Sequence, residues 1–294
     1  MRFLSGFCFA LVSLAYAAGA DAEKLRVVLI DGQNNHNWQQ TTPVLKKHLE
    51  DSGRFTVTVA TTPPKGQKAE MEKFTIDLSK YDVIVSNYNG DSWPKALNAD
   101  IDAKLKEGTI ALTIIHAANN AFSGWKEFNQ MIGMGWRDAK YGKRLKYDET
   151  GKEVIVDAGQ DLGSGHRYTG PFTITVRDAE HPIAKGMPKE WLHARDELYD
   201  NMRGPIENVK VLATAIPPKG SKGTGVHEPM IWTVTYGKGR VFHTPMGHDA
   251  NAMRCVGFVS TLNRGTEWAA TGKVTLELPK NFPTADKVSL VDAK

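Results

Sequence analysis

One apolar stretch constrains the fold of this chain more than any other feature of its sequence. From Thr109 to Ile115 the residues are apolar or β-branched and do not alternate with charged ones. A strand of this kind is buried on both faces, as strands are in parallel sheets covered by helices. It ends at His116, which small and polar residues follow. Because ligands bind at the carboxyl ends of parallel strands, His116 stands where a functional group is expected.

The segments before this strand predict a doubly wound parallel half-sheet. Further strands are predicted over 25–30, 55–60 and 81–86, with helices over 42–51 and 98–107 between them. Thr42 is the expected cap of the first helix and Pro43 its first residue. Strands that alternate with helices in this way are typical of a parallel sheet with helices on both faces.

The second half of the chain has more turns and fewer helical segments. Hairpins are predicted from 143–147 with 153–157 and from 230–235 with 240–244, single strands over 171–177 and 209–215, and helices at 124–132, after Asp178 and over 251–263. No repeat or linker divides the chain. The prediction is one three-layer α/β domain over 25–275, in which helices flank a mostly parallel central sheet and β-hairpins are added in the second half, with a tail over 276–294.

The N-terminus and the charge limit where the protein works and what it binds. Residues 1–20 combine a basic start, an apolar run and small residues at a cleavage point, which predicts a signal peptide and export without a stable membrane anchor. The formal net charge is only +4 and the basic residues are scattered, so nucleic acid is not an expected partner. Cys255, the one cysteine left after cleavage, is expected to be a buried small hydrophobe. Nothing indicates the oligomeric state.

Several polar side chains follow predicted strands at one edge of the sheet. They are His36, Asn87, His116, Asn119, His243 and His248. Histidines that converge from separate strands can bind a metal ion or transfer protons near neutral pH. None of the spacings is a local metal or nucleophile motif. Each histidine alone is therefore better explained as a hydrogen-bonded structural residue, and only the set favours a site.

Other segments extend this pattern along the chain. They are Gly32 with His36-Asn37-Trp38, Ile114–Ala118 with Phe122 and Trp125, His181-Pro182-Ile183, Asp196-Glu197-Leu198-Tyr199, Pro229–Trp232, and Tyr236–His243 with Gly247-His248. In this order, over about 25–270, they resemble the trehalose-utilisation (ThuA-like) family, which implies the fold of the class I glutamine amidotransferases. Those enzymes attack glutamine with a cysteine on the strand-to-helix turn. Here the turn carries His116, so amidotransferase activity is not expected.

The resemblance implies a role in disaccharide metabolism, in which a sugar hydroxyl is oxidised to a ketone. A 3-keto group acidifies the proton on C2, so a base can remove it and expel the anomeric substituent, and addition of water completes a net hydrolysis. This reaction needs a base, an electrophile for the enolate and an acid for the leaving group. We predict a hydrolase or lyase that acts on a small keto-sugar glycoside, with a divalent, zinc-like metal ion as candidate cofactor and no nucleotide cofactor.

The residue types suggest roles within this candidate site. His116 and His248 are placed nearest the reacting centre, and Glu197 is assigned as an acid or orienting carboxylate. His36 and His243 complete the candidate metal set with His116 and His248, or supply the base. The candidate substrate contacts are Trp38, Asn87, Trp93, Asn119 and Trp125. Indole faces can stack on a sugar ring, although packing is the competing explanation for each tryptophan.

The alternative hypothesis is a non-catalytic carbohydrate-binding protein on the same fold. In that case the histidines at the strand ends have only structural roles. Metal content and turnover of 3-keto-glycosides separate the two hypotheses.

Overall fold

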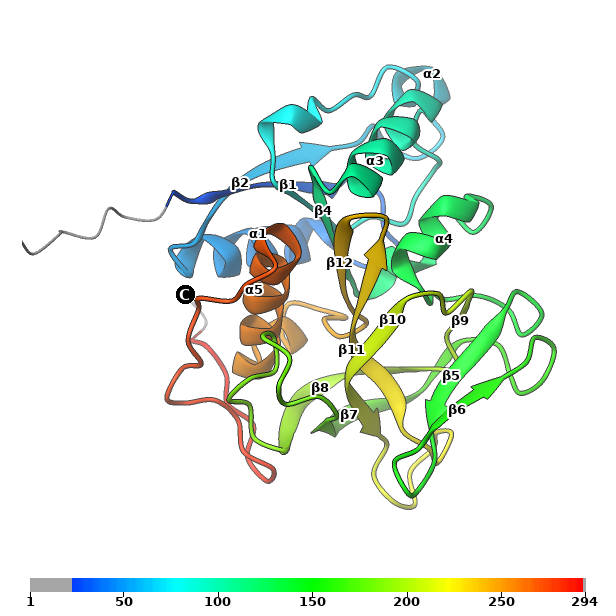
Figure 1. Ribbon diagram of the computed structural model, residues 1–294, viewed down its shortest axis with the longest axis vertical. Coiled ribbons are helices and arrows are strands. Elements are labelled where there is room, and N and C mark those ends of the chain that lie inside the picture. The colour runs from blue at the N-terminus through cyan, green and yellow to red at the C-terminus, as the bar shows by residue number, and fades with distance from the viewer. Residues whose placement is uncertain (1–22, 293–294) are drawn as a thin grey trace, which may run out of the picture.

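A nine-stranded mixed sheet runs through the centre of the structure, a computed structural model that describes residues 23–292 (Figure 1). Its parallel half consists of β2 (Phe55–Thr61), β1 (Leu25–Asp31), β3 (Val83–Ser86), β4 (Ala111–Ile115) and β12 (Gly239–Thr244), in this order. Its antiparallel half continues with β11 (Glu228–Tyr236), β10 (Val209–Ile216), β7 (Gly165–Val176) and β8 (Glu190–Asp200).

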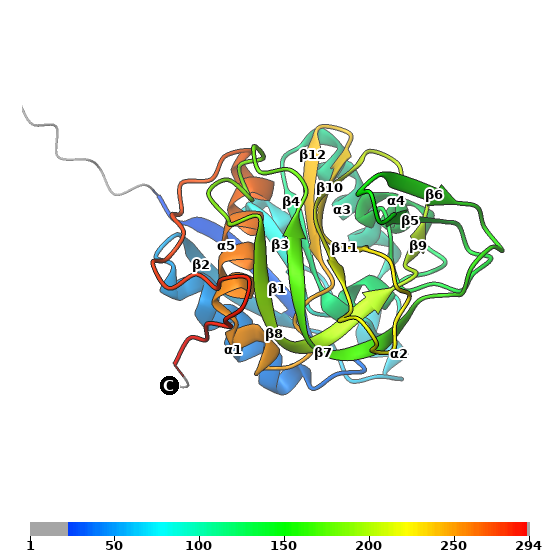
Figure 2. The same cartoon turned by 90° about the horizontal axis from the view of Figure 1, so that it is seen from below.

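Helices cover both faces of the parallel half. Helices α1 (Trp38–Asp51) and α5 (Val256–Thr271) lie on one side, and α3 (Lys95–Glu107) and α4 (Lys126–Ile132) on the other (Figure 2). Successive residues of β1 alternate between the two cores, with Val27 and Leu29 in one and Val28 and Ile30 in the other. A strand that is apolar at every position is therefore buried on both faces, as the sequence predicts.

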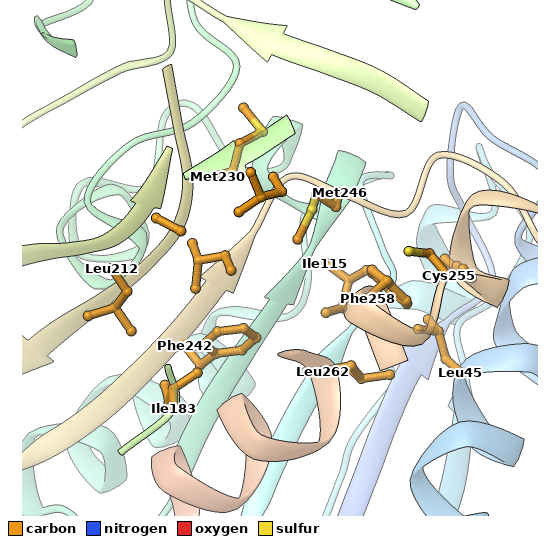
Figure 3. Close-up of a cluster of buried hydrophobic side chains, with 14 of the residues drawn as sticks. Leu45, Ile115, Ile183, Leu212, Met230, Phe242, Met246, Cys255, Phe258 and Leu262 are labelled. Atoms are coloured by element: carbon orange, nitrogen blue, oxygen red, sulfur yellow. The ribbon is translucent and has the colours of Figure 1, made fainter. Parts of the chain in front are cut away.

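The core beneath α5 joins the two halves of the sheet. Ile115 of β4 and Phe242 of β12 lie below Phe258 and Leu262 of α5 (Figure 3). All four side chains are fully buried. Because Ile115 directly precedes His116, this packing fixes the backbone from which the histidine projects.

Shorter elements complete the domain. They are α2 (Lys68–Met71), the 3₁₀ turns η1 (Leu78–Lys80), η2 (His116–Asn120) and η3 (Ala252–Arg254), and a small sheet of β6 (Glu153–Val156), β5 (Lys143–Tyr147) and β9 (Arg203–Gly204). The predicted fold class is confirmed, because helices flank a central sheet with five parallel strands and hairpins are added in the second half.

Three local predictions are wrong. The first helix begins at Trp38, because the side chain of Asn37 caps it by accepting a hydrogen bond from the Gln40 amide at 3.2 Å, and Pro43 lies inside the helix. The segment after Asp178 forms turns and no helix. No strand was predicted around Asp196-Glu197, but this segment is part of the long strand β8.

The two ends of the chain complete this description. The predicted signal peptide, 1–20, lies outside the described residues. Within 23–292 no helix has the length and apolar character that crossing a membrane requires. The described part of the predicted tail packs on the domain through Leu276, Leu278 and Phe282, and the amide of Leu192 on the edge strand β8 donates to Thr284 O at 2.8 Å.

Candidate metal centre

Three histidines and one glutamate converge at the carboxyl edge of the parallel half. His36 follows β1, His116 follows β4, His248 follows β12, and Glu197 belongs to β8. One nitrogen of each histidine and one carboxylate oxygen all lie within 4.8 Å of one another. Four donor atoms this close, from four separate parts of the chain, can surround a single metal ion.

The Glu197 carboxylate lies at the middle of this cluster. Its Oε2 is 3.2 Å from His248 Nδ1, 3.5 Å from His116 Nε2 and 3.8 Å from His36 Nε2. Burial alone would raise the pKa of Glu197, but the contacts with His116, His248 and His36 outweigh it and hold this pKa well below its usual range. The surrounding imidazoles therefore favour the charged form of Glu197, which suits the role of an orienting carboxylate better than that of an acid.

Backbone and amide oxygens orient two of the imidazoles. His116 Nδ1 lies 2.6 Å from Pro245 O, and His36 Nδ1 lies 3.3 Å from Asn34 Oδ1. An oxygen acceptor at Nδ1 places the ring proton there, so the lone pair of Nε2 is directed into the cluster. Within residues 23–292 the buried His248 Nδ1 has no hydrogen-bond partner, despite its closeness to Glu197. Unsatisfied buried nitrogens are rare, and this one has its lone pair available for a ligand.

The backbone of His116 is strained. Its φ is +44°, in the left-handed region that residues other than glycine rarely adopt, at the sharp turn from β4 into η2. Such strain is concentrated at functional sites. The turn presents the His116 imidazole at the carboxyl end of β4. The one cysteine among the described residues, Cys255, is buried beside His193 and not at this turn.

Comparison with known proteins identifies the family. The family model described as "Trehalose utilisation" (ThuA) matches residues 26–269. This chain belongs to the ThuA family. It is similar to a ThuA-like protein of Parabacteroides merdae, whose crystal structure has 43% sequence identity, a TM-score of 0.86 and coverage of 92% of this chain and 98% of that one. A ThuA-like protein of Bacteroides uniformis shares the fold at 16% identity and a TM-score of 0.58, with coverage of 89% and 97%. A comparison with curated proteins found no match.

His243 does not join the cluster in this ThuA-family chain. It is fully buried on β12, where its Nδ1 donates to Ile132 O at 3.2 Å and its Nε2 accepts from the Asn119 amide at 3.2 Å. Both ring nitrogens are thus occupied by protein partners, and neither is available to a metal ion. Burial lowers the pKa of His243 to about 3, so the ring is neutral. Its position supports the structural interpretation over the predicted ligand role.

Four of the five predicted substrate contacts have side chains that are engaged in contacts within the protein. Asn87 donates to the hydroxyls of Thr41 and Thr42, and Asn119 is fully buried against His243. Trp93 and Trp125 pack around Phe122 in an aromatic cluster of the core. Trp38 differs, because it lines a cavity of about 570 Å³ together with Asn34, Asn35, Gln39, Lys65 and Asn89.

Two further residues reach the centre without having been predicted. His166 on β7 places its Nδ1 3.4 Å from Glu197 Oε1, and its side chain is 45% exposed. Tyr199 on β8 places its hydroxyl 3.0 Å from His116 Nε2. Tyr199 could have been found once the segment was read as a strand, because residues two apart lie on one face and Glu197 was already a candidate. No sequence signal marks His166.

A larger cavity lies away from this centre. It has a volume of about 840 Å³ and is enclosed by α1, α5 and the C-terminal segment. None of the residues of the candidate metal centre lines it. The chemistry of the four converging ligands, rather than cavity size, therefore identifies the candidate site.

Proposed function

We propose that this protein is an exported, metal-dependent enzyme that hydrolyses a keto-sugar glycoside or eliminates its anomeric substituent. One observation carries this proposal, namely the convergence of His36, His116, His248 and Glu197 within 4.8 Å. Burying ionisable side chains costs free energy, so clusters of them are concentrated at functional sites. Membership of the ThuA family supports the substrate class, and the sequence of residues 1–20 supports export.

The residues present fit a divalent metal ion of the zinc type. Three imidazoles and one carboxylate are borderline ligands that zinc prefers, and two of the imidazoles already have the proton on the nitrogen facing away from the cluster. His36, His116, His248 and Glu197 would hold the ion, which would act as a Lewis acid toward a carbonyl oxygen. Binding at His116 Nε2 would replace the hydrogen bond from the Tyr199 hydroxyl.

The proposed reaction is an elimination followed by hydration. The C2–H bond breaks, its electrons form a C1=C2 double bond, and the C1–O bond to the anomeric substituent breaks. The departing oxygen takes a proton, and water then adds across the double bond. Together these steps consume one water and release the substituent as an alcohol, with no change of oxidation state.

Two residues outside the ligand set are placed to serve this reaction. His166 is half-exposed at the mouth of the centre, next to Glu197 Oε1, and we assign the transfer of the C2 proton to its imidazole. Burial raises the pKa of the Tyr199 hydroxyl, so Tyr199 keeps its proton and acts as a hydrogen-bond donor. A donor at this position would stabilise the enolate oxygen as its negative charge develops.

The cavity lined by Asn35 and Trp38, the residues on either side of the His36-Asn37 pair in the chain, supplies a place for the rest of the sugar. Its volume of about 570 Å³ is that of a small-molecule site, and an indole with several amides forms its wall. Indole faces bind the apolar face of a sugar ring, and amides bind its hydroxyls. We infer that the aglycone or second sugar lies along Trp38.

The test combines metal analysis with turnover. Protein purified without chelator is expected to contain about one zinc-like ion per chain and to release the anomeric substituent from 3-keto-glycosides. His116→Ala should lose both properties. His227→Ala is the matched control, because His227 lies outside the cluster and contacts Thr214. Metal-free protein with unchanged turnover in His116→Ala would contradict the proposal. Sugar binding without turnover would favour the non-catalytic alternative.

A further inference from the structure

A buried carboxylate connects the two chain segments that carry Glu197 and His248. Asp196 is 1% exposed and directly precedes Glu197 in β8. Its Oδ1 accepts hydrogen bonds from the amides of Glu197 at 2.8 Å and His248 at 3.0 Å. Its Oδ2 accepts from the amide of Gly247 at 2.7 Å and from His193 Nε2 at 2.8 Å. One side chain thus occupies four donors from three places in the chain.

These four bonds use the full acceptor capacity of a carboxylate. An ionised carboxylate has about four lone-pair sites and no donor, so no other side chain of this size could satisfy the same set. All four partners of Asp196 are donors, a set that a carboxylate can accept at every oxygen lone pair and that leaves no acceptor for a carboxyl proton. Charge-assisted bonds to amides are about twice as strong as neutral ones.

Asp196 is hydrogen-bonded to the backbone of both Glu197 and His248. The loop after β12 contains no helix or strand between Pro245 and Asn251, so the path of its backbone depends on such bonds. Asp196 fixes the amides of Gly247 and His248 relative to β8, and β8 in turn carries Glu197. The imidazole of His248 then stands 3.2 Å from the Glu197 carboxylate.

His193 provides the fourth hydrogen bond to Asp196. It is fully buried, three residues before Asp196 on the same strand. Its Nε2 donates to Asp196 Oδ2 at 2.8 Å, so the carboxylate also receives a bond from within its own strand.

We propose that Asp196 is a positioning residue of the metal centre, whose hydrogen bonds hold Glu197 and His248 at the separation that one metal ion requires. This inference rests on the proposed metal site. Outer partners of metal ligands commonly contribute about 10- to 100-fold to metal affinity. Asp196 contacts none of the four metal-binding atoms. It acts through its hydrogen bonds to the backbone of Glu197 and His248.

Asp196→Asn tests the proposal, because it keeps the shape of the side chain and directs an amide N–H₂ at groups that are themselves donors. Glu267→Gln is the matched control. Glu267 is also a buried carboxylate that accepts loop amides, those of Thr275 and Leu276, but it contributes nothing to the centre. Competition with a chelating dye should show Zn²⁺ affinity at least about tenfold weaker in Asp196→Asn and within about twofold of wild type in Glu267→Gln.

Amide hydrogen exchange of the metal-free proteins separates failure of this inference from failure of the proposed function. Asp196→Asn should accelerate exchange over 245–250, and Glu267→Gln should not. Unchanged exchange overturns the inference, and so does faster exchange with unchanged Zn²⁺ affinity. If wild type binds no Zn²⁺, the proposed function fails, and exchange alone decides whether Asp196 positions the loop.

A second variant covers the case in which Asp196→Asn does not fold. His193→Ala leaves the three amide bonds to Asp196 in place and removes the bond from His193 Nε2 to Oδ2. We expect a smaller but measurable loss of Zn²⁺ affinity, about threefold to tenfold, with circular dichroism showing a folded protein. Wild-type affinity in a folded His193→Ala protein would contradict a role for this bond in holding Asp196.

Discussion

The two halves of the sheet contribute to the candidate centre in different ways. The parallel half supplies histidines from loops, since His36, His116 and His248 each follow the carboxyl end of a strand. The antiparallel half supplies Glu197 from within β8, with His166 on β7 beside it. A strand end is placed by topology alone, whereas a residue in mid-strand reaches a site through strand length and register.

The parallel strands and the small sheet also differ in how deeply their side chains are buried. Every residue of β3 and β4 is buried, and β1 is buried from Val27 onward. In the small sheet, β6 alternates between exposed and half-buried positions. The parallel strands are therefore buried more deeply than β6, and the small sheet should tolerate change.

The largest expected effect tests this difference in burial. Ile30→Ala removes a fully buried side chain from β1 and should lower the free energy of unfolding by about 2–5 kcal/mol. Ile155→Ala in β6, where the side chain is 44% exposed, should change it by less than about 0.5 kcal/mol. Urea unfolding followed by circular dichroism measures both. Similar losses in the two variants would show that β6 contributes as much to stability as the buried strand β1.

The second prediction asks whether the antiparallel half is needed at the centre. Glu197→Gln removes the charge that attracts the ion, and Zn²⁺ affinity should fall by more than about 100-fold, since even outer partners contribute about 10- to 100-fold. Glu190→Gln on the same strand, at an exposed position, should leave the affinity unchanged. Isothermal titration at pH 7 measures both. Full affinity in Glu197→Gln would mean that the parallel half binds the ion alone.

The third prediction concerns His243, which lies on β12 where the two halves meet. The unfolded chain takes up a proton on this ring below about pH 6.5, whereas in the folded chain burial lowers the pKa to about 3. The free energy of unfolding should therefore decrease as pH falls from about 6.5 toward 3, by up to about 1.4 kcal/mol per pH unit from this group.

His243→Gln provides the comparison for that prediction. Glutamine has no titrating group, so the stability difference between wild type and variant should shrink as the pH falls from 7 to 4. Urea unfolding at several pH values measures the difference. A difference that is independent of pH would show that His243 is not a neutral buried ring.

The parallel half could be predicted from the sequence because its signals are local. Uniformly apolar strands and the polar residues after them gave β1, β4 and the positions of His36, His116 and His248. The strand β8 was not predicted because its charged residues, among them Asp196 and Glu197, resemble a solvated turn until their buried partners are known. His243 was misassigned for the converse reason, since a strand end predicts an edge position but not which face the ring occupies.

The smallest expected effect separates two tryptophans that the sequence treats alike. Both Trp38 and Trp125 lie in or next to loops that leave the parallel half. Only Trp38 lines the cavity of about 570 Å³, while Trp125 packs on Phe122 and Phe128. Trp38→Ala should weaken binding of a keto-glycoside about 2- to 10-fold, the value of one aromatic stacking contact. Trp125→Ala should leave sugar affinity unchanged and lower the free energy of unfolding instead. Titration of each variant with the sugar, alongside urea unfolding, distinguishes the two effects. If Trp125→Ala weakened sugar binding as much as Trp38→Ala, the binding surface would extend across the loops of the parallel half, and the cavity lined by Trp38 would be only part of it.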